Sequence, residues 1–295
     1  MQSLLRLLGH QKWIRFGIRD RIIRAFHNPD TSPSRPFIVP FFDRIYTGNF
    51  STYIDWCTYY YGAYAGEELD VMRDVLNGTP DPVVLDVGAN IGHHSLFAST
   101  IAKEVHSFEP FPKALTKLHE KIGANSITNI KVHEIGLGET SEDLPFSQPV
   151  GCNTGTGSFV DASINGLNAL SLPIRVGDEY LKALRLPKID FIKIDIEGFE
   201  PQALRGLCHT LNIYRPVVFF EWSANERKAD VKLKTLFPNE YTIYNLVTGQ
   251  HFLGLFQKTN YALIEDLPPF YDGNKIAIPN ERLNDIPIIK GKIIR

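Results

Sequence analysis

The sequence predicts an α/β fold, in which a mostly parallel sheet ends in an antiparallel hairpin and follows an N-terminal helical arm. Seven apolar runs have the length of buried strands, and they lie at residues 82–87, 104–108, 129–135, 189–194, 216–221, 241–247 and 259–264. Helical patterns at 94–102 and 112–124 separate the early runs, as in a parallel sheet covered on both faces. A glycine-containing loop also follows the first run, where such sheets bind ligands.

Residues 1–26 predict an amphipathic helix rich in basic residues. They contain six Lys or Arg residues against Asp20 alone, and apolar side chains lie between the charges. Two interpretations fit this pattern, namely contact with an anionic membrane surface and packing on the protein's own fold. On a helical projection Arg15 falls within the apolar stripe and Trp13 lies opposite, so packing is favoured.

The next segments lead from the arm into the main domain. Residues 28–40 contain four prolines and predict an extended connector. In the aromatic stretch that follows, residues 67–76 have helical spacing that stops at Asn77-Gly78. We therefore expect an N-terminal arm and an aromatic, substrate-side segment over residues 1–60, and one domain over residues 61–295.

The last two apolar runs differ from the earlier ones. Few residues connect 241–247 to 259–264, apart from a turn at Thr248-Gly249. So short a connection predicts an antiparallel hairpin that closes the sheet.

Composition and charge limit the partners and the compartment. The 31 Lys and Arg nearly balance the 33 Asp and Glu, so no overall field favours nucleic acid. Cys57, Cys152 and Cys208 lie far apart without a CxxC pair, so neither a zinc site nor a disulfide framework is expected. No apolar run approaches the roughly 18 residues of a membrane span. We expect a cytoplasmic protein, peripheral to the membrane only if the arm binds lipid.

The stretch VVLDVGANIGHHS, residues 83–95, predicts a ligand-binding loop between a strand and a helix. Its glycines, Gly88 and Gly92, suit a tight turn or a close approach of backbone to ligand. Asp86 argues against a pyrophosphate, because a carboxylate at the strand end repels that group. An acid in this place favours a ligand with a cationic head. The alternative is an ordinary strand-to-helix turn.

Glu109 ends the next strand, in VHSFEP, some 21 residues after Gly88. At that spacing an acid reaches the hydroxyls of a ribose, and a carboxylate accepts hydrogen bonds from both hydroxyls of a diol. A solvated charge before a proline is the simpler alternative. Together with Asp86, Glu109 predicts a nucleoside that carries a positive charge, which fits S-adenosylmethionine.

Several blocks of the sequence resemble the FkbM-type S-adenosylmethionine-dependent methyltransferases. These blocks are LDVGANIGHHS, SFEP, VGDEYL, DFIKIDIEGFEPQALRG and PVVFFEWS, and the resemblance runs from about residue 64 to residue 265. IKIDIEGFE is the most specific block, because every class I methyltransferase shares the glycine loop. The resemblance implies a Rossmann-like class I fold with a seven-stranded sheet, and methyl transfer to a hydroxyl of a sugar, glycolipid or natural product.

The resemblance also implies roles for individual residues. Glu109 would take the ribose of the cofactor, Gly136 would flank the adenine, and Asp195 would lie close to the methionine part and to the acceptor. The cofactor loop would consist of Asp86, Gly88, Ala89, Asn90 and Gly92. His93 and His94 are less settled, because a histidine at this place can pack or act in catalysis.

Three acids at strand ends predict the chemistry of the acceptor side. Asp195 and Glu197 end one strand and Glu221 ends the next, which is a geometry that suits a Mg²⁺ ion. The alternative is metal-free catalysis, in which Asp195 or Glu197 removes the proton of the acceptor hydroxyl, with His93 or His94 as further candidates. Lys193 could instead neutralise one of the acids as a structural ion pair.

Two further segments are candidates for contact with the acceptor. Tyr60, Tyr61 and Tyr64 combine an apolar ring with a polar tip, which suits a sugar face, although such clusters also form cores. Residues 151–159 form a polar loop that could cover the acceptor or simply connect two elements.

The function predicted from the sequence is O-methylation of a small-molecule, glycan or glycolipid acceptor. N-methylation of an amine is the nearest alternative. A dinucleotide-dependent dehydrogenase is disfavoured by Asp86 and by the lack of GxGxxG. A non-catalytic nucleotide-binding module is the remaining alternative, and the acids at the strand ends argue against it.

Overall fold

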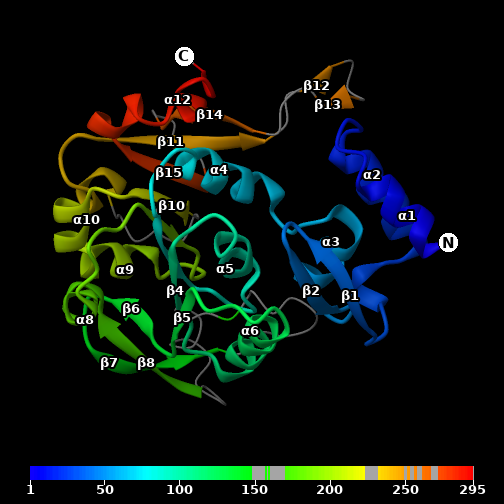
Figure 1. Ribbon diagram of the computed structural model, residues 1–295, viewed down its shortest axis with the longest axis horizontal. Coiled ribbons are helices and arrows are strands. Elements are labelled where there is room, and N and C mark those ends of the chain that lie inside the picture. Colours follow the sequence, from blue (N-terminus) through cyan, green and yellow to red (C-terminus); the bar gives the residue numbers. More distant parts are fainter. Residues whose placement is uncertain are drawn as a thin grey trace.

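The computed structural model describes residues 1–147, 157, 159, 170–222, 232–248, 251–252, 256–257, 261–266 and 272–294. Within these residues the central sheet has nine strands, in the order β16-β14-β11-β15-β10-β9-β3-β4-β5 (Figure 1). Their bounds are β3 Val83–Val87, β4 Glu104–Phe108, β5 Ile130–His133, β9 Phe191–Ile194, β10 Val217–Trp222, β11 Tyr241–Thr248, β14 Tyr261–Glu265, β15 Gly273–Pro279 and β16 Ile293–Ile294. The strands from β10 to β5 run parallel to one another. The expected α/β class with a mostly parallel sheet is confirmed.

The C-terminal part of the sheet differs from the expected seven-stranded arrangement. β11 and β14 form the expected antiparallel pair. However, β15 lies between β11 and β10, antiparallel to both, and β16 pairs with β14. The sequence of β15 gives a weak strand signal because Lys275 interrupts it. That lysine is fully buried and lies 2.9 Å from the carboxylate of Asp266, a pairing that only the folded chain creates.

Helices cover both faces of the sheet. One face carries α4 Gly66–Leu76, α5 His93–Ala98 and α6 Pro112–Ala124, and the other carries α8 Gly177–Leu184, α9 Glu200–Gly206 and α10 Cys208–Tyr214. Neighbouring residues of a strand face opposite layers, so that Val84 packs in one core cluster and Leu85 in the other. The runs are continuously apolar because both faces are buried.

Smaller elements surround the central sheet. They are the three-stranded sheet of β6 Gly136–Gly138, β8 Leu170–Val176 and β7 Glu142–Phe146, the pair β12 His251–Phe252 and β13 Phe256–Gln257, and the short helices η2 Leu233–Leu236, η3 Asn280–Asn284 and α12 Pro287–Lys290. No helix in the described ranges is both long and apolar enough to cross a membrane. Cys57 is buried and Cys208 exposed, both as free thiols, while Cys152 and Gly249 lie outside the described residues.

The N-terminal segment contains more structure than an arm and a connector. It consists of α1 Gln2–Gly9, α2 Phe16–Phe26, η1 Pro29–Thr31, β1 Pro36–Phe41, β2 Arg44–Asn49 and α3 Tyr53–Tyr61. The expectation of one extended connector over residues 28–40 was therefore wrong, because a short 3-10 helix and a strand occupy it. β1 tolerates its prolines because, among the described strands, it pairs with β2 alone, and Pro36 and Pro40 are exposed.

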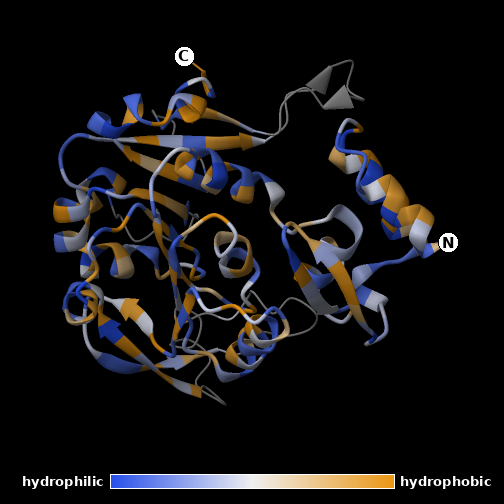
Figure 2. Cartoon of the chain, viewed as in Figure 1, coloured by the Kyte–Doolittle hydropathy of each residue, from blue (hydrophilic) through white to orange (hydrophobic). Residues whose placement is uncertain are grey.

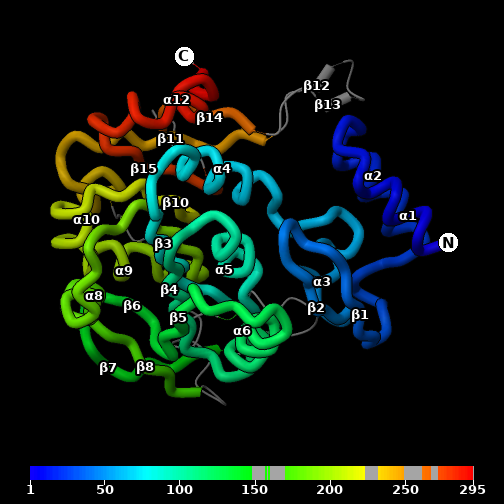
Figure 3. The backbone as a smooth tube through the Cα atoms, in the orientation of Figure 1, coloured from blue at the N-terminus to red at the C-terminus, as the bar shows by residue number. Residues whose placement is uncertain are grey.

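The arm formed by α1 and α2 packs on α3, which is the interpretation that the sequence favoured. Leu5, Ile23, Trp56 and Tyr60 share one buried cluster. A Cβ atom at Gly9 would lie 2.0 Å from the carbonyl oxygen of Tyr60, so the backbones of α1 and α3 are in direct contact. Figure 3 shows the two arm helices beside α3, away from the central sheet.

The outer surface of the arm remains apolar in places. Leu4, Leu7, Trp13 and Phe26 are each more than half exposed. Figure 2 shows this hydrophobic colouring along α1 and α2.

We expect Gly9→Ala to loosen the arm. The added methyl group collides with backbone, and overpacking of this kind costs about 1–3 kcal/mol. Gly17→Ala is the matched control, because no atom lies within 4 Å of a Cβ at Gly17. Urea unfolding and limited proteolysis of residues 1–26 measure the effect. Equal stability and equal protease resistance of the two variants would contradict the close contact.

Candidate active site

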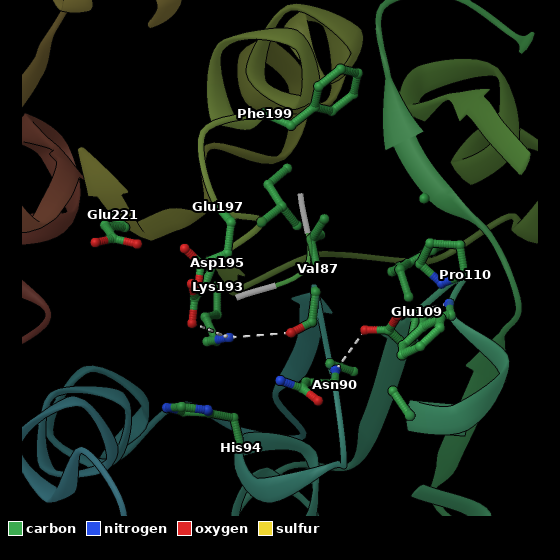
Figure 4. A pocket seen from close by; sticks show the side chains of 18 of the residues that line it. Val87, Asn90, His94, Glu109, Pro110, Lys193, Asp195, Glu197, Phe199 and Glu221 are labelled. Atoms are coloured by element: carbon green, nitrogen blue, oxygen red, sulfur yellow. Dashed lines mark hydrogen bonds and ion pairs between the residues drawn. The ribbon is translucent and has the colours of Figure 1, made fainter. Parts of the chain in front are cut away.

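A cavity of about 260 Å³ lies where β3, β4, β9 and β10 reach their carboxyl ends. Its wall includes most residues that the sequence singled out for the cofactor and for catalysis (Figure 4). These are Gly88, Ala89, Asn90, His93, His94, Glu109, Gly136, Lys193, Asp195, Glu197 and Glu221. Asp86 and Gly92, which were also predicted to bind the cofactor, do not line the cavity.

The glycine loop is shaped by close contact with its neighbours. Gly88 has a φ of +82°, and a Cβ atom there would lie 2.0 Å from the carbonyl oxygen of Asp195. Gly92 has a φ of +84°, and a Cβ atom there would meet Leu118 of α6 at 2.4 Å. Glycine is needed at both places for the left-handed backbone and for space. Gly88 thereby brings the loop against the end of β9.

Asp86 lies behind the loop, fully buried. One of its carboxylate oxygens accepts a hydrogen bond from Ser95 Oγ at 2.6 Å, and the other lies 3.6 Å from Lys193 Nζ. The same ammonium lies 3.2 Å from the carboxylate of Asp195. Register places Asp86 of β3 directly beside Lys193 of β9. Asp86 therefore meets a cation of the protein itself, and Asp195 is the acid of the pair that faces the cavity.

The charges of this cluster stabilise one another. Burial acts to lower the pKa of Lys193, but the carboxylates of Asp195 and Asp86 outweigh it and raise that pKa. Burial acts to raise the pKa of Asp195, but Lys193 outweighs it, with a contribution from His94, and the pKa is lowered. Lys193 is therefore a stable cation and Asp195 a stable carboxylate. A carboxylate with a lowered pKa is a weak proton acceptor.

Glu109 connects the end of β4 to the glycine loop. Its carboxylate accepts a hydrogen bond from the backbone N–H of Asn90 at 2.8 Å (Figure 4) and another from the N–H of Phe111, also at 2.8 Å. Burial raises the pKa of Glu109 to about 7, against the lowering effect of these two hydrogen bonds. The carboxyl group therefore changes its charge close to neutral pH.

His94 forms a pair with an acid that the sequence did not single out. Its Nε2 lies 3.0 Å from the carboxylate of Glu68 on α4. The other carboxylate oxygen of Glu68 accepts a hydrogen bond from Asn274 Nδ2 at 2.8 Å. Because Nε2 donates to Glu68, a neutral His94 has its acceptor at Nδ1. This is the arrangement in which an acid orients a histidine for proton transfer. The Glu67-Glu68 pair at the start of a helix carried no signal of this role.

His93 is a packing residue. It lies among Phe41, Tyr46 and Tyr64, with ring centroids 4.9 to 6.1 Å from its own. Its Nε2 lies 3.0 Å from the carbonyl oxygen of Tyr64, so this nitrogen donates the hydrogen bond. Burial and the neighbouring His94 lower the pKa of His93 well below its usual value, which keeps the ring neutral.

The acids expected to hold Mg²⁺ do not form a cation site. In the described part of the chain, no three His, Cys, Asp or Glu side chains come close enough together to hold a metal ion. Glu197 is exposed, whereas Asp195 is partly buried beside Lys193. Glu200, which the sequence analysis missed, holds this turn. Its carboxylate accepts from the N–H groups of Ile196 at 2.8 Å and Gly198 at 2.9 Å.

The opposite end of the cavity is apolar. Phe111, Phe146, Phe159 and Phe199 form a row in which successive ring centroids are 5.1 to 5.4 Å apart. Gly136 lies at the same end, where a Cβ atom would collide with Ile174 at 2.6 Å. Apart from residues 157 and 159, the polar loop predicted over 151–159 lies outside the described residues.

Among the three tyrosines expected near a ligand, only Tyr64 lines this cavity. Tyr60 is fully buried in the aromatic cluster under the arm. Tyr61 donates its hydroxyl to Asp20 of α2 at 2.8 Å. The tyrosine cluster is therefore largely a core, with Tyr64 at its edge.

The chain matches the model of one protein family, the methyltransferase FkbM domain, over residues 86–239. That range is just over half of the chain. The chain belongs to the FkbM methyltransferase family. The matched range includes the glycine loop, Glu109 and Asp195, and the resemblance predicted from the sequence blocks is confirmed.

Two relatives of this FkbM family member are named as a hexuronic acid methyltransferase and as a 2-O-methyltransferase. The chain is 33% identical over 146 residues to the hexuronic acid methyltransferase AglP of Haloferax volcanii, and this alignment covers 49% of the chain and 58% of AglP. The chain is 26% identical over 162 residues to the 2-O-methyltransferase NoeI of Sinorhizobium fredii, and this second alignment covers 50% of the chain and 65% of NoeI. The chain thus spans less than two thirds of the length of each relative.

A solved structure of the methyltransferase FkbM from Methylobacillus flagellatus KT is 20% identical to this chain. The superposition of the two structures covers 67% of this chain and 43% of the Methylobacillus chain, with a TM-score of 0.42. A TM-score of this size carries no conclusion about function.

We expect Lys193→Met to destabilise the fold by about 3–5 kcal/mol, because it leaves the buried carboxylate of Asp86 without its counter-charge. The double variant Lys193→Met/Asp86→Asn should regain part of the loss, since it removes the unpaired charge as well. Chemical denaturation of the three proteins measures the free energies of unfolding. A loss below 1 kcal/mol in the single variant, or no recovery in the double variant, would contradict the coupling.

Proposed function

We propose that this chain transfers a methyl group from S-adenosylmethionine to a hydroxyl group of a sugar or of a related small molecule. The observation that carries the proposal is the layout of the cavity. A carboxylate that holds the glycine loop and an apolar pocket lie at one end, and an ion-pair cluster with a histidine lies at the other. Membership of the methyltransferase family supports it, as do the names of two relatives, a hexuronic acid methyltransferase and a 2-O-methyltransferase.

The residues of the cavity fit this cofactor. Asn90 Oδ1 is buried and has no hydrogen-bond partner among the described residues, so it is open to a donor group of a ligand. Glu109 would hold the ribose hydroxyls, Gly136 and Phe111 would border the adenine, and the carboxylate of Asp195 would attract the positive charge. When bound, S-adenosylmethionine supplies a methyl group activated by the positive charge of its sulfonium.

His94 is the proposed general base. A hydroxyl group becomes a good nucleophile only as its proton leaves, and a positioned base accelerates this by about 10² to 10⁴. Glu68 holds His94 so that Nδ1 can accept the proton, and the resulting imidazolium is stabilised by the carboxylates of Glu68 and Asp195. We assign Asp195, a leading candidate on sequence grounds, a charge-stabilising role instead, because Lys193 lowers its pKa.

The His94–Glu68 pair favours an oxygen acceptor over a nitrogen acceptor. A neutral amine attacks through its lone pair and needs no base before the attack. An alcohol needs one, and the cavity contains one that is oriented by an acid. The proposal needs no metal ion.

We expect the affinity for S-adenosylhomocysteine to fall below neutral pH. The ionised carboxylate of Glu109 accepts from both ribose hydroxyls, and its pKa of about 7 means that it is largely protonated at pH 6. The affinity should therefore rise from pH 6 to pH 8 by up to about tenfold. Glu109→Gln should bind about 1–3 kcal/mol more weakly at pH 8, with no such pH dependence.

Titration calorimetry at pH 6, 7 and 8 measures these affinities. An affinity of the wild-type protein that is unchanged across this range would exclude the contact between Glu109 and ribose. An absence of binding at every pH would argue against the cofactor itself.

We expect His94→Ala to lower kcat by about 10² to 10⁴ while binding of S-adenosylhomocysteine is retained. Glu68→Gln should cause a smaller loss, because it weakens the orientation of His94 and leaves the base in place. His119→Ala is the matched control, since His119 is an exposed histidine on α6. The assay follows transfer of a radiolabelled methyl group from S-adenosylmethionine to p-nitrophenyl glucoside and p-nitrophenyl glucuronide. Full activity of His94→Ala would remove His94 from the mechanism.

A further inference from the structure

A second cleft, of about 690 Å³, lies beside the first cavity. Its wall combines the arm at residues 10–19, the turn of the β1–β2 hairpin at Phe42, the end of α3 and the start of α4. Tyr64 lines both the cleft and the cavity. Tyr64 is therefore a wall that the cleft shares with the cavity proposed for methyl transfer.

Arg19 is an unusual wall residue. It is only 5% exposed, and it forms no salt bridge within the described part of the chain. One of its terminal nitrogens donates to the carbonyl oxygen of Gly9, while its Nε is buried without a hydrogen-bond partner. A buried guanidinium normally pairs with an acid, since isolated burial of its charge is costly. Arg19 therefore has donor capacity for an anionic ligand.

The other charged groups of the cleft are mostly basic. His10, Lys12 and Arg15 line it together with Arg19, against Glu67 and Asp70. Asp70 is already paired with Arg73 outside the cleft wall, at 2.7 Å.

The remaining acid of the cleft wall is Glu67. Burial and the charges of Asp70 and Glu68 raise the pKa of its carboxyl group. The pKa of His10 is lowered by burial and by Arg6, Lys12 and Arg19, which is the expected effect of a positive surrounding. By residue type, the cleft wall carries three permanent cations, Lys12, Arg15 and Arg19, against two acids, one of which is paired with Arg73.

Aromatic rings line the same cleft. Phe16 and Phe42 are 43% and 48% exposed, and Tyr61 lies 5.0 Å from Phe16 between ring centroids. Exposed aromatic rings offer flat apolar surfaces to the faces of a sugar. Cations beside aromatic rings suit a ligand that has both a sugar ring and an anionic group.

We propose that this cleft binds the acceptor, and that the acceptor is a sugar bearing an oxyanion, a carboxylate or a phosphate, which Arg19 and Lys12 recognise. The inference rests on the proposed function, because it assigns the acceptor side of the same centre. Residues 10–19 and Phe42 lie outside the range that matches the family model, so this recognition belongs to the N-terminal segment of this chain.

The test measures direct binding of three probes by saturation-transfer NMR in the presence of S-adenosylhomocysteine. The probes are p-nitrophenyl glucoside, p-nitrophenyl glucuronide and p-nitrophenyl glucoside 6-phosphate, which share a ring and differ in charge. We expect at least one anionic probe to bind fivefold or more tightly than the neutral one, and the stronger of the two identifies the oxyanion. Binding of both anionic probes within twofold of the neutral probe, or binding of neither, overturns the proposal.

Charge variants locate the binding. Lys12→Glu should weaken the anionic probe at least fivefold and change the neutral probe less than twofold, and Arg19→Gln should do the same if the arm stays folded. Lys182→Glu, a reversal at an exposed lysine of α8, should change none of the affinities. Equal losses for both probe types in Lys12→Glu overturn the assignment to this cleft. A protein that binds the anionic probe but transfers no methyl group contradicts the proposed function alone.

Discussion

The architecture of the active cavity depends on one buried ammonium group. Lys193 of β9 lies between the carboxylates of Asp86 on β3 and Asp195 after β9, and it joins the ends of two neighbouring strands. Buried singly, each of these charges would be strongly destabilising, whereas together they form a satisfied cluster. The cluster also decides roles in the cavity. Because Lys193 lowers the pKa of Asp195, we assign Asp195 a fixed negative charge in the proposed mechanism and propose His94, which Glu68 orients, for proton transfer.

Two other acids, Glu109 and Glu200, accept hydrogen bonds from backbone N–H groups of the protein itself. Glu109 accepts from the N–H groups of Asn90 and Phe111, and Glu200 accepts from those of Ile196 and Gly198. Each carboxylate therefore fixes a loop at the end of a strand, which gives the cavity its shape. Preorganised polar groups of this kind stabilise charge without rearrangement during the reaction. Both acids follow a strand in the sequence, and in the structure both hold the backbone of a loop that follows a strand.

The N-terminal segment forms a second cleft outside the range that matches the family model. The arm packs on α3, the β1–β2 hairpin contributes Val39 and Phe41 to a core cluster that also contains Leu69 and Phe97, and a second cleft forms between these parts. Tyr64 lies where this cleft meets the cavity. The central sheet therefore carries the groups proposed for the cofactor, and the added segment carries the basic and aromatic groups proposed for the acceptor.

The sequence by itself determined the α/β class, seven strands of the central sheet, the helices α4 and α6 and the position of the cavity. The seven strands are β3, β4, β5, β9, β10, β11 and β14. Those features follow from local periods of apolar residues and from glycines whose backbone angles other residues rarely adopt. It did not show β15, whose buried Lys275 needs Asp266. It also did not show the Glu68–His94 pair, whose two residues lie 26 positions apart in the chain on two different helices. It also left open that Asp86 faces Lys193 and not the cavity. Such pairings were decided by the tertiary structure, because the partner of a buried charge is a neighbour in space and leaves no pattern in the sequence around it.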